Sequence, residues 1–125
     1  MDKKVGVVCF IIKDNKILLA KIQYSSNDQK WNGIGGFVDN SESPEDAVVR
    51  EFNEETFIKI NKEDLIKFKE LGSDIKLIIF KISKWDGEIK PKEISIKEFK
   101  WFDFDKIPYN QMFADNKDWL PELIE

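Results

Sequence analysis

The chain has 125 residues and a mass of 14.7 kDa, and its 42% hydrophobic and 35% charged residues suit a single folded domain spanning residues 1–125. It holds no histidine and one cysteine, Cys9, which excludes Ser-His-Asp and Cys-His catalytic sets, histidine-containing zinc sites and an intramolecular disulfide. The net charge of −4 argues against binding to duplex nucleic acid, so an enzyme of this composition would rely on carboxylates, lysines or backbone amides.

Two apolar runs near the N-terminus predict a β-hairpin. Strands are expected at about 4–12 and 16–22, with Asp14 and Asn15 in the turn between them. A secretory signal is the alternative, but the first run ends in charged residues without a small-residue cleavage site. No stretch approaches the roughly 20 apolar residues of a membrane span, and the lone Cys9 suits a reducing compartment. We therefore expect a cytoplasmic protein with no membrane partner.

The next segment is first polar and then rich in glycine. Residues 23–30 are expected to form a loop. Gly33, Gly35 and Gly36 then fall within four positions, which indicates a bulge or a close approach of the backbone to another group. A flexible turn is the alternative.

Residues 43–56 predict the longest helix of the chain. Ser43 suits the N-cap, Pro44 suits the first helical position, and Asp46 follows the cap by three residues as in a capping box. The later expected elements are strands at 65–71, 75–83 and 98–103, a turn at 85–88, and a short helix at 116–124 that Pro121 limits. One long helix among about six strands predicts an α+β or mixed α/β domain.

Three carboxylates share one side of the predicted helix. Glu51, Glu54 and Glu55 fall within roughly 100° of arc, where like charges repel and a hard cation such as Mg²⁺ would relieve the conflict. A solvated acidic face is the ordinary alternative. Arg50 directly precedes Glu51, and its planar guanidinium can hold a carboxylate with two hydrogen bonds. Glu42 is its candidate partner, and an ordinary surface arginine is the alternative.

At this point the residues resemble a known family. The pattern G-x5-E-x7-R-E-U-x-E-E-x-G-U of the Nudix box, where U is a bulky apolar residue, matches residues 36–58 except that its last glycine is Phe57. The helix is therefore expected to end without a left-handed glycine. Residues 31–36 and 101–121 also resemble the MutT branch of the family, especially the animal enzymes that act on oxidised purine nucleoside triphosphates. The resemblance implies an α/β/α sandwich around a mixed sheet.

The resemblance implies hydrolysis of a nucleoside diphosphate linked to another group, with Mg²⁺ or Mn²⁺ as the cofactor. The catalytic residues are expected to be Glu51, Arg50 and Glu54. One glutamate would accept the proton of the attacking water; which one does so varies across the family, and we expect Glu51 here. A further metal ligand from Glu93 or Glu98 stays open, and an ordinary solvated residue is the alternative for each. The resemblance implies that the metal ligands are Glu51, Glu54, Glu55 and the backbone carbonyl of Gly35 or Gly36. It also implies that Glu42 and Arg50 orient these ligands.

The resemblance also implies a pocket for the base. An asparagine amide offers one acceptor and two donors, which complements the O6 acceptor and the N7–H donor of 8-oxoguanine. Related enzymes carry a lysine, a tryptophan and an aspartate where this chain has Phe37, Phe113 and Asn116, so base specificity is the property most open to change. A turn cap and core packing are the alternatives for the C-terminal residues. The implied pocket residues are Asn32, Gly35, Gly36, Phe37, Phe113, Asp115 and Asn116.

These expectations combine into one function. The chain is expected to be a Mg²⁺-dependent pyrophosphohydrolase that converts oxidised purine nucleotides such as 8-oxo-dGTP to the monophosphate and pyrophosphate, a step of nucleotide-pool sanitation and DNA repair. A Nudix hydrolase of a pyrimidine triphosphate, nucleotide sugar or dinucleotide polyphosphate is one alternative. A nucleotide-binding Nudix module without catalysis is another. The expected partner is a small nucleotide, and both a monomer and a homodimer stay open.

Overall fold

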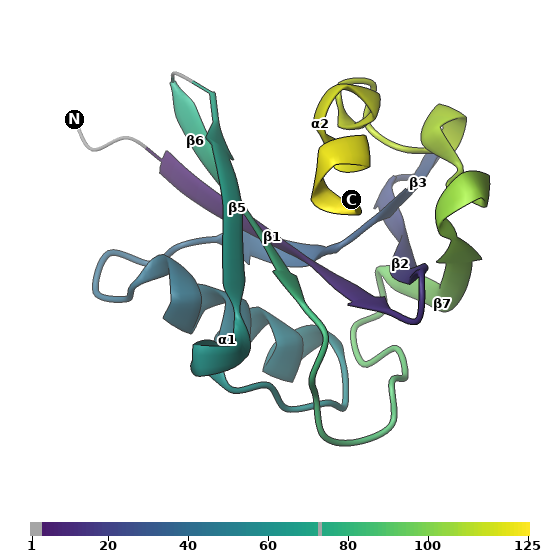
Figure 1. Ribbon diagram of the computed structural model, residues 1–125. Coiled ribbons are helices and arrows are strands. Elements are labelled where there is room, and N and C mark those ends of the chain that lie inside the picture. The colour runs from purple at the N-terminus through teal and green to yellow at the C-terminus, as the bar shows by residue number, and fades with distance from the viewer. Residues whose placement is uncertain (1–3, 73) are drawn as a thin grey trace.

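The computed structural model describes residues 4–72 and 74–125 and places one helix on each face of a mixed β-sheet (Figure 1). The strands are β1 (Lys4–Lys13), β2 (Lys16–Ser25), β3 (Asp28–Asn32), β4 (Ile34–Phe37), β5 (Ile66–Leu71), β6 (Ile75–Ile82) and β7 (Ile96–Asp103). The helices are α1 (Pro44–Glu55) and α2 (Asn116–Leu123), with 3-10 turns at Lys62–Asp64, Phe104–Lys106 and Tyr109–Gln111. Across the described ranges, no helix has the length and apolar character needed to cross a membrane.

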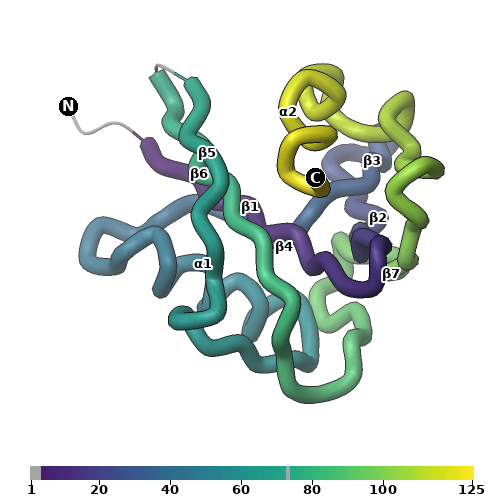
Figure 2. The backbone as a smooth tube through the Cα atoms, in the orientation of Figure 1, coloured from purple at the N-terminus to yellow at the C-terminus, as the bar shows by residue number. Residues whose placement is uncertain are grey.

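Strand β1 is the centre of the sheet. One of its edges pairs in parallel with β6, and its other edge is shared by two antiparallel strands. Strand β4 pairs with β1 over residues 6–9, whereas β2 pairs with it only over residues 11–13 and then continues to pair with β3 and β7. The strands beyond this edge therefore diverge, as the backbone tube shows (Figure 2).

Two cores lie on the two faces of the sheet. Successive side chains of a strand point to opposite faces, and in β1 Cys9 packs in the core on the α1 side while Phe10 packs in the core on the α2 side. Helix α1 contributes Phe52 to the first core and α2 contributes Leu120 to the second, both fully buried. Burying such a side chain stabilises the fold by about 1.5–3 kcal/mol. This arrangement confirms the expected α/β/α sandwich.

Most of the expected elements are confirmed. The N-terminal hairpin turns at Asp14 and Asn15, which both adopt positive φ, and Ser43 caps α1 by accepting a hydrogen bond from the Asp46 backbone N–H. The loop expected at residues 23–30 is wrong, because β2 continues to Ser25 and β3 begins at Asp28. This part of the hairpin has few buried residues, so polar side chains stay in water while their backbones pair.

The C-terminal end of α1 is closed without glycine, as expected. Thr56 follows the helix in an extended conformation, and its hydroxyl donates to the Phe52 carbonyl while accepting from the Ile58 N–H. The threonine thus satisfies backbone groups that a left-handed glycine often satisfies at such a position. Phe57 needs no left-handed conformation and stays exposed. The carboxylates of the last helical turn are therefore held on a regular helix.

Candidate active site

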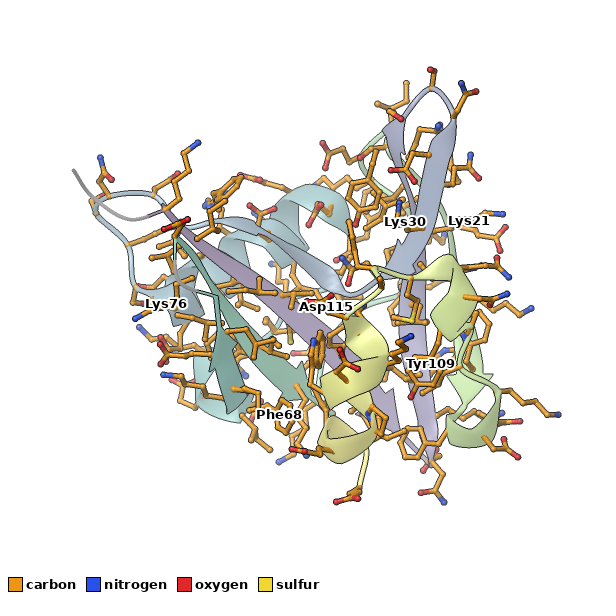
Figure 3. All side chains as sticks on the ribbon, turned by 90° about the horizontal axis from the view of Figure 1, so that it is seen from above. Lys21, Lys30, Phe68, Lys76, Tyr109 and Asp115 are labelled. Atoms are coloured by element: carbon orange, nitrogen blue, oxygen red, sulfur yellow. The ribbon has the colours of Figure 1, made fainter. Side chains whose placement is uncertain are left out.

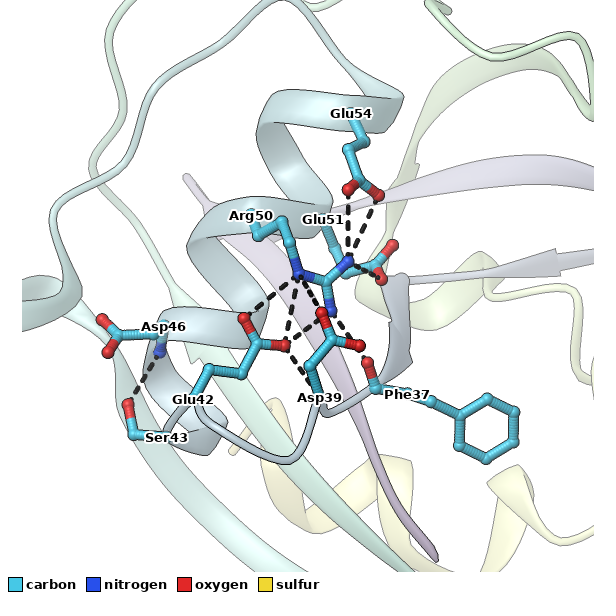
Figure 4. Close-up of polar contacts among 8 residues, drawn as sticks. All are labelled: Phe37, Asp39, Glu42, Ser43, Asp46, Arg50, Glu51 and Glu54. Carbon is cyan, nitrogen blue, oxygen red and sulfur yellow. Dashed lines mark hydrogen bonds and ion pairs between the residues drawn. The ribbon is translucent and has the colours of Figure 1, made fainter.

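Arg50 lies at the centre of an ion-pair network on α1 (Figure 4). Its Nε and Nη2 both donate to the Glu42 carboxylate, at 3.2 and 2.7 Å, and its Nη2 also donates to the Phe37 carbonyl at 2.8 Å. Its Nη1 donates to Glu51 at 2.9 Å and to Glu54 at 3.2 Å. The predicted pairing of Arg50 with Glu42 is confirmed. The guanidinium ties the loop before α1 and the end of β4 to two carboxylates of the helix.

The network also fixes charge states. Hydrogen bonds from Arg50 and from the Asp39 backbone N–H lower the pKa of Glu42 and keep it ionised. The hydrogen bond to Glu42 raises the pKa of Arg50 further above its ordinary value. Asp39 adds a carboxylate 3.7 Å from Arg50 Nε, a partner that the sequence pattern did not indicate. The orienting pair is thus fully charged at neutral pH.

Two of the three helix carboxylates are buried. Glu51 and Glu55 are 8% and 9% exposed, whereas the Glu54 side chain is largely in solvent. Burial raises the pKa of Glu51 against the opposing effect of Arg50. Burial, together with the adjacent charge of Glu51, raises the pKa of Glu55 to about 9. The site therefore contains acidic groups that are costly to ionise unless a cation joins them.

The glycine-rich strand passes directly under these carboxylates. A Cβ atom on Gly36 would lie 2.4 Å from Glu51 Oε1, and one on Gly35 would lie 1.9 Å from the Val7 carbonyl oxygen of β1. Both distances are far below van der Waals contact, so a side chain at Gly35 would collide with the backbone of β1 and a side chain at Gly36 would force the Glu51 carboxylate to move. The predicted close approach of the backbone is confirmed, and it brings Gly36 next to Glu51.

The acidic residues suit a divalent metal ion. One oxygen of Glu55, Oε2, is buried and has no hydrogen-bond partner in the part of the chain that the structure describes. Oxygen donors are the ligands that Mg²⁺ and Mn²⁺ prefer. Within residues 4–72 and 74–125, no three acidic side chains are already gathered closely enough to hold an ion. In this structure Arg50 Nη1 holds both Glu51 and Glu54.

The two candidate extra ligands lie in different places. Glu93 follows β6 in a segment that contacts the end of α1, where the Lys92 N–H donates to the Glu55 carbonyl, and its charge contributes to the raised pKa of Glu55. Glu98 lies in β7, opposite Lys21 in the antiparallel pairing of β7 with β2. Of the two candidates, Glu93 is therefore the one whose charge affects Glu55.

A cavity of about 480 Å³ opens where the strands beyond β1 diverge. It brings together residues from the glycine-rich strand and from the C-terminal segment that the sequence analysis placed in one pocket. Asn116 is 5% exposed, whereas Phe37 and Phe113 are each more than a third exposed. The predicted pocket residues that line it are Asn32, Gly35, Gly36, Phe37, Phe113, Asp115 and Asn116.

Two of the cavity residues that the sequence analysis missed carry polar side-chain atoms. Tyr24 lines the cavity from the part of β2 that was expected to be a loop. The signal was available, because Leu18, Ala20, Ile22 and Tyr24 continue one period-2 face of the strand. Trp119 of α2 also lines the cavity, and its buried Nε1–H has no hydrogen-bond partner among residues 4–72 and 74–125. The sequence analysis placed it in the segment that resembles the MutT branch but did not assign it to the pocket.

Known proteins are similar to this chain in sequence and fold. The chain matches the NUDIX domain family over residues 2–123. It is 32% identical to an oxidized purine nucleoside triphosphate hydrolase of Danio rerio over 98% of this chain and 80% of the relative. It is 33% identical to an ADP-ribose pyrophosphatase of Methanocaldococcus jannaschii over 83% of this chain and 64% of the relative.

A solved structure agrees with these matches. The MutT NUDIX hydrolase from Burkholderia pseudomallei superposes with a TM-score of 0.79 at 25% identity, over 91% of this chain and 93% of that one. The shared fold, the family match over nearly the whole chain and the box residues gathered on α1 and in the strand and loop before it lead to one assignment. The chain belongs to the NUDIX domain family and is a Nudix hydrolase.

Proposed function

We propose that the protein hydrolyses oxidised purine nucleoside triphosphates such as 8-oxo-dGTP to the monophosphate and pyrophosphate. The observation that carries the proposal is the position of the cavity, which shares Gly36 with the carboxylate site. A base in the cavity would place its phosphates beside Glu51. A relative named for oxidised purine triphosphates, matched over 98% of this chain, supports the same substrate class.

The reaction depends on a divalent cation, Mg²⁺ or Mn²⁺, held by Glu51, Glu54, Glu55 and a backbone carbonyl of Gly35 or Gly36. When bound, the ion neutralises phosphate oxygens and lowers the pKa of the attacking water. Glu51 is the general base and accepts the proton of that water on a carboxylate oxygen. Arg50 and Glu42 hold this carboxylate group in place.

Side-chain amides recognise the purine base of the nucleotide. Asn32 and Asn116 each offer one acceptor and two donors, which can pair with the O6 acceptor and the N7–H donor of an 8-oxoguanine ring. Unmodified guanine has no N7–H, so it would leave one amide acceptor without a partner. An unpaired buried polar group costs about 1–3 kcal/mol, and discrimination of roughly 5- to 150-fold follows.

The test is kinetic. The values of kcat/KM are compared for 8-oxo-dGTP, dGTP, dCTP, ADP-ribose and a diadenosine polyphosphate in the presence of Mg²⁺. The proposal expects 8-oxo-dGTP to exceed dGTP by at least about fivefold, with pyrophosphate as the second product. A higher value for any unmodified nucleotide or dinucleotide overturns it.

A second candidate function has a specific observation behind it. The ADP-ribose pyrophosphatase relative is as similar in sequence as the triphosphate hydrolase, although its match covers a smaller share of both chains. The same carboxylate site would then cleave the pyrophosphate of ADP-ribose. Products distinguish the two, because ADP-ribose yields AMP and ribose phosphate and releases no pyrophosphate.

For either substrate we propose a single Nudix domain over residues 1–125. We also propose a cytoplasmic location, which suits the free buried thiol of Cys9.

A further inference from the structure

Both ends of the Asn32 side-chain amide are held. The Gly33 backbone N–H, which can only donate, lies 2.8 Å from one end of the amide and identifies that end as Oδ1. Nδ2 therefore faces Tyr24 and donates to its hydroxyl oxygen at 3.1 Å. The amide keeps one free Nδ2 hydrogen and one free lone pair on Oδ1. These are the groups that remain to recognise a ligand.

The aromatic ring of Tyr24 also has a packing partner. It packs edge-on against Phe113, with ring centroids 5.1 Å apart and planes inclined by 73°. Lys30 of β3 lies over the Phe113 ring at 5.1 Å from its centroid. Figure 3 shows Lys30 on the β2–β3 hairpin and Asp115 beside α2. Tyr24 thus joins the hairpin to the C-terminal segment across the cavity.

The hydroxyl of Tyr24 has a second capacity. It accepts from Asn32 and keeps its own proton, since burial together with the charges of Glu55 and Asp28 raises its pKa. Tyr24 lines the cavity, so this proton is available to an acceptor atom of a ligand there. A phenol in this position adds a donor beside an amide of fixed orientation.

We propose that Tyr24 is the positioning residue for the Asn32 amide and thereby determines how sharply the cavity distinguishes an oxidised purine from an unmodified one. The proposal rests on the proposed function. Without the phenol hydroxyl, Asn32 is held only through Oδ1, and its Nδ2 is free to rotate away from the base or towards water.

The test uses Tyr24→Phe, which removes the hydroxyl and keeps the ring against Phe113. The ratio of kcat/KM for 8-oxo-dGTP to that for dGTP is expected to fall roughly three- to tenfold. The fall is expected in KM for the oxidised nucleotide, with kcat within about twofold, because the variant leaves the carboxylate site intact. The matched control is Tyr109→Phe, which deletes the hydroxyl of the other tyrosine of the chain, outside the cavity. It should leave the ratio unchanged.

A double-mutant cycle separates positioning from packing. In an Asn32→Ala background, Tyr24→Phe should change the ratio by less than twofold, because the amide that the hydroxyl positions is gone. Tyr24→Phe with an unchanged ratio, or a full effect in the Asn32→Ala background, overturns the inference.

Binding of 8-oxo-dGMP and dGMP without metal, measured by calorimetry, keeps the inference separate from the proposed function. If wild-type protein prefers neither nucleotide in hydrolysis, the proposed function fails, and the inference still requires weaker 8-oxo-dGMP binding by Tyr24→Phe. If neither monophosphate binds the wild-type protein, both fail.

Discussion

Glu42 and Arg50, eight positions apart in sequence, form a two-pronged ion pair in which Nε and Nη2 of the arginine meet one carboxylate at 3.2 and 2.7 Å. Glu42 precedes α1, so the pair fixes the entry loop against the helix. The remaining nitrogen, Nη1, then faces Glu51 and Glu54. One planar group thus sets the positions of the carboxylates proposed to bind the metal.

Arg50→Lys keeps the positive charge and removes the planar guanidinium that binds several carboxylates at once. We expect kcat to fall by roughly 10- to 100-fold, because one ammonium cannot hold Glu42 and Glu51 at once, and small displacements of catalytic groups have effects of this size. Initial rates at saturating nucleotide and Mg²⁺ measure it. Lys62→Gln is the control, since Lys62 pairs with Asp46 on the same helix and lies outside the network. Equal rates for Arg50→Lys and wild type would contradict the proposed orienting role.

Glu51→Gln removes the proposed base while keeping shape. We expect kcat to fall by about 10²–10⁴-fold, the usual contribution of a general base. The melting temperature should not fall, because burial already disfavours the charge of Glu51. Single-turnover kinetics and circular dichroism give the two readings. Glu63→Gln, in an exposed 3-10 turn, serves as the carboxylate control. A variant that turns over normally would remove Glu51 from the catalytic set.

Gly36→Ala tests the close approach under the carboxylates. Its Cβ would stand 2.4 Å from Glu51 Oε1, so the glutamate must shift and we expect kcat to fall at least tenfold with the fold retained. In a Glu51→Gln background the same change should add little further loss. Gly35→Ala should behave differently, because its Cβ meets the Val7 carbonyl oxygen at 1.9 Å and breaks the β1–β4 pairing. Thermal melts separate the two, and equal melting temperatures for both variants would refute this contrast.

The pH dependence of stability follows from Glu55. Its pKa is raised from 4.5 to about 9 in the folded protein, so the folded state binds more protons than the unfolded state between these values. The free energy of unfolding of the metal-free protein therefore falls as pH rises through this window, by at most about 1.4 kcal/mol per pH unit for this group. Urea denaturation at pH 6, 7.5 and 9 measures the slope.

Glu55→Gln should reduce the dependence of the free energy of unfolding on pH. In the wild-type protein, Mg²⁺ should counteract the loss of stability at high pH. The ion favours the ionised carboxylate, so its affinity should rise with pH up to about 9. Calorimetric titration with Mg²⁺ alone tests the second expectation. A slope that survives unchanged in Glu55→Gln would assign the pH dependence to other groups.

Local rules in the sequence accounted for α1 and for the residues on it. Ser43, Pro44 and Asp46 marked the start of the helix, and the spacing of Glu51, Glu54 and Glu55 placed them on one side of it. These features depend on neighbours a few positions apart. The hairpin of β2 and β3 was missed because the polar character of residues 23–30 outweighed the alternating face that Ile22 and Tyr24 continue from the start of β2. The pairing of the polar positions is a backbone property that side-chain pattern does not report.

The helix, its N-cap, the carboxylate set and the neighbouring glycines could be predicted from the sequence alone, because each is encoded by residue type and short-range spacing. The tertiary structure sets how Arg50 divides its nitrogens among Glu42, Glu51 and Glu54, since that choice depends on where the entry loop meets the helix. It also decided that Tyr24 holds Asn32. That contact exists because β1 shares one edge between β4 and β2, and the divergence of these strands opens the cavity that Tyr24 and Asn32 line.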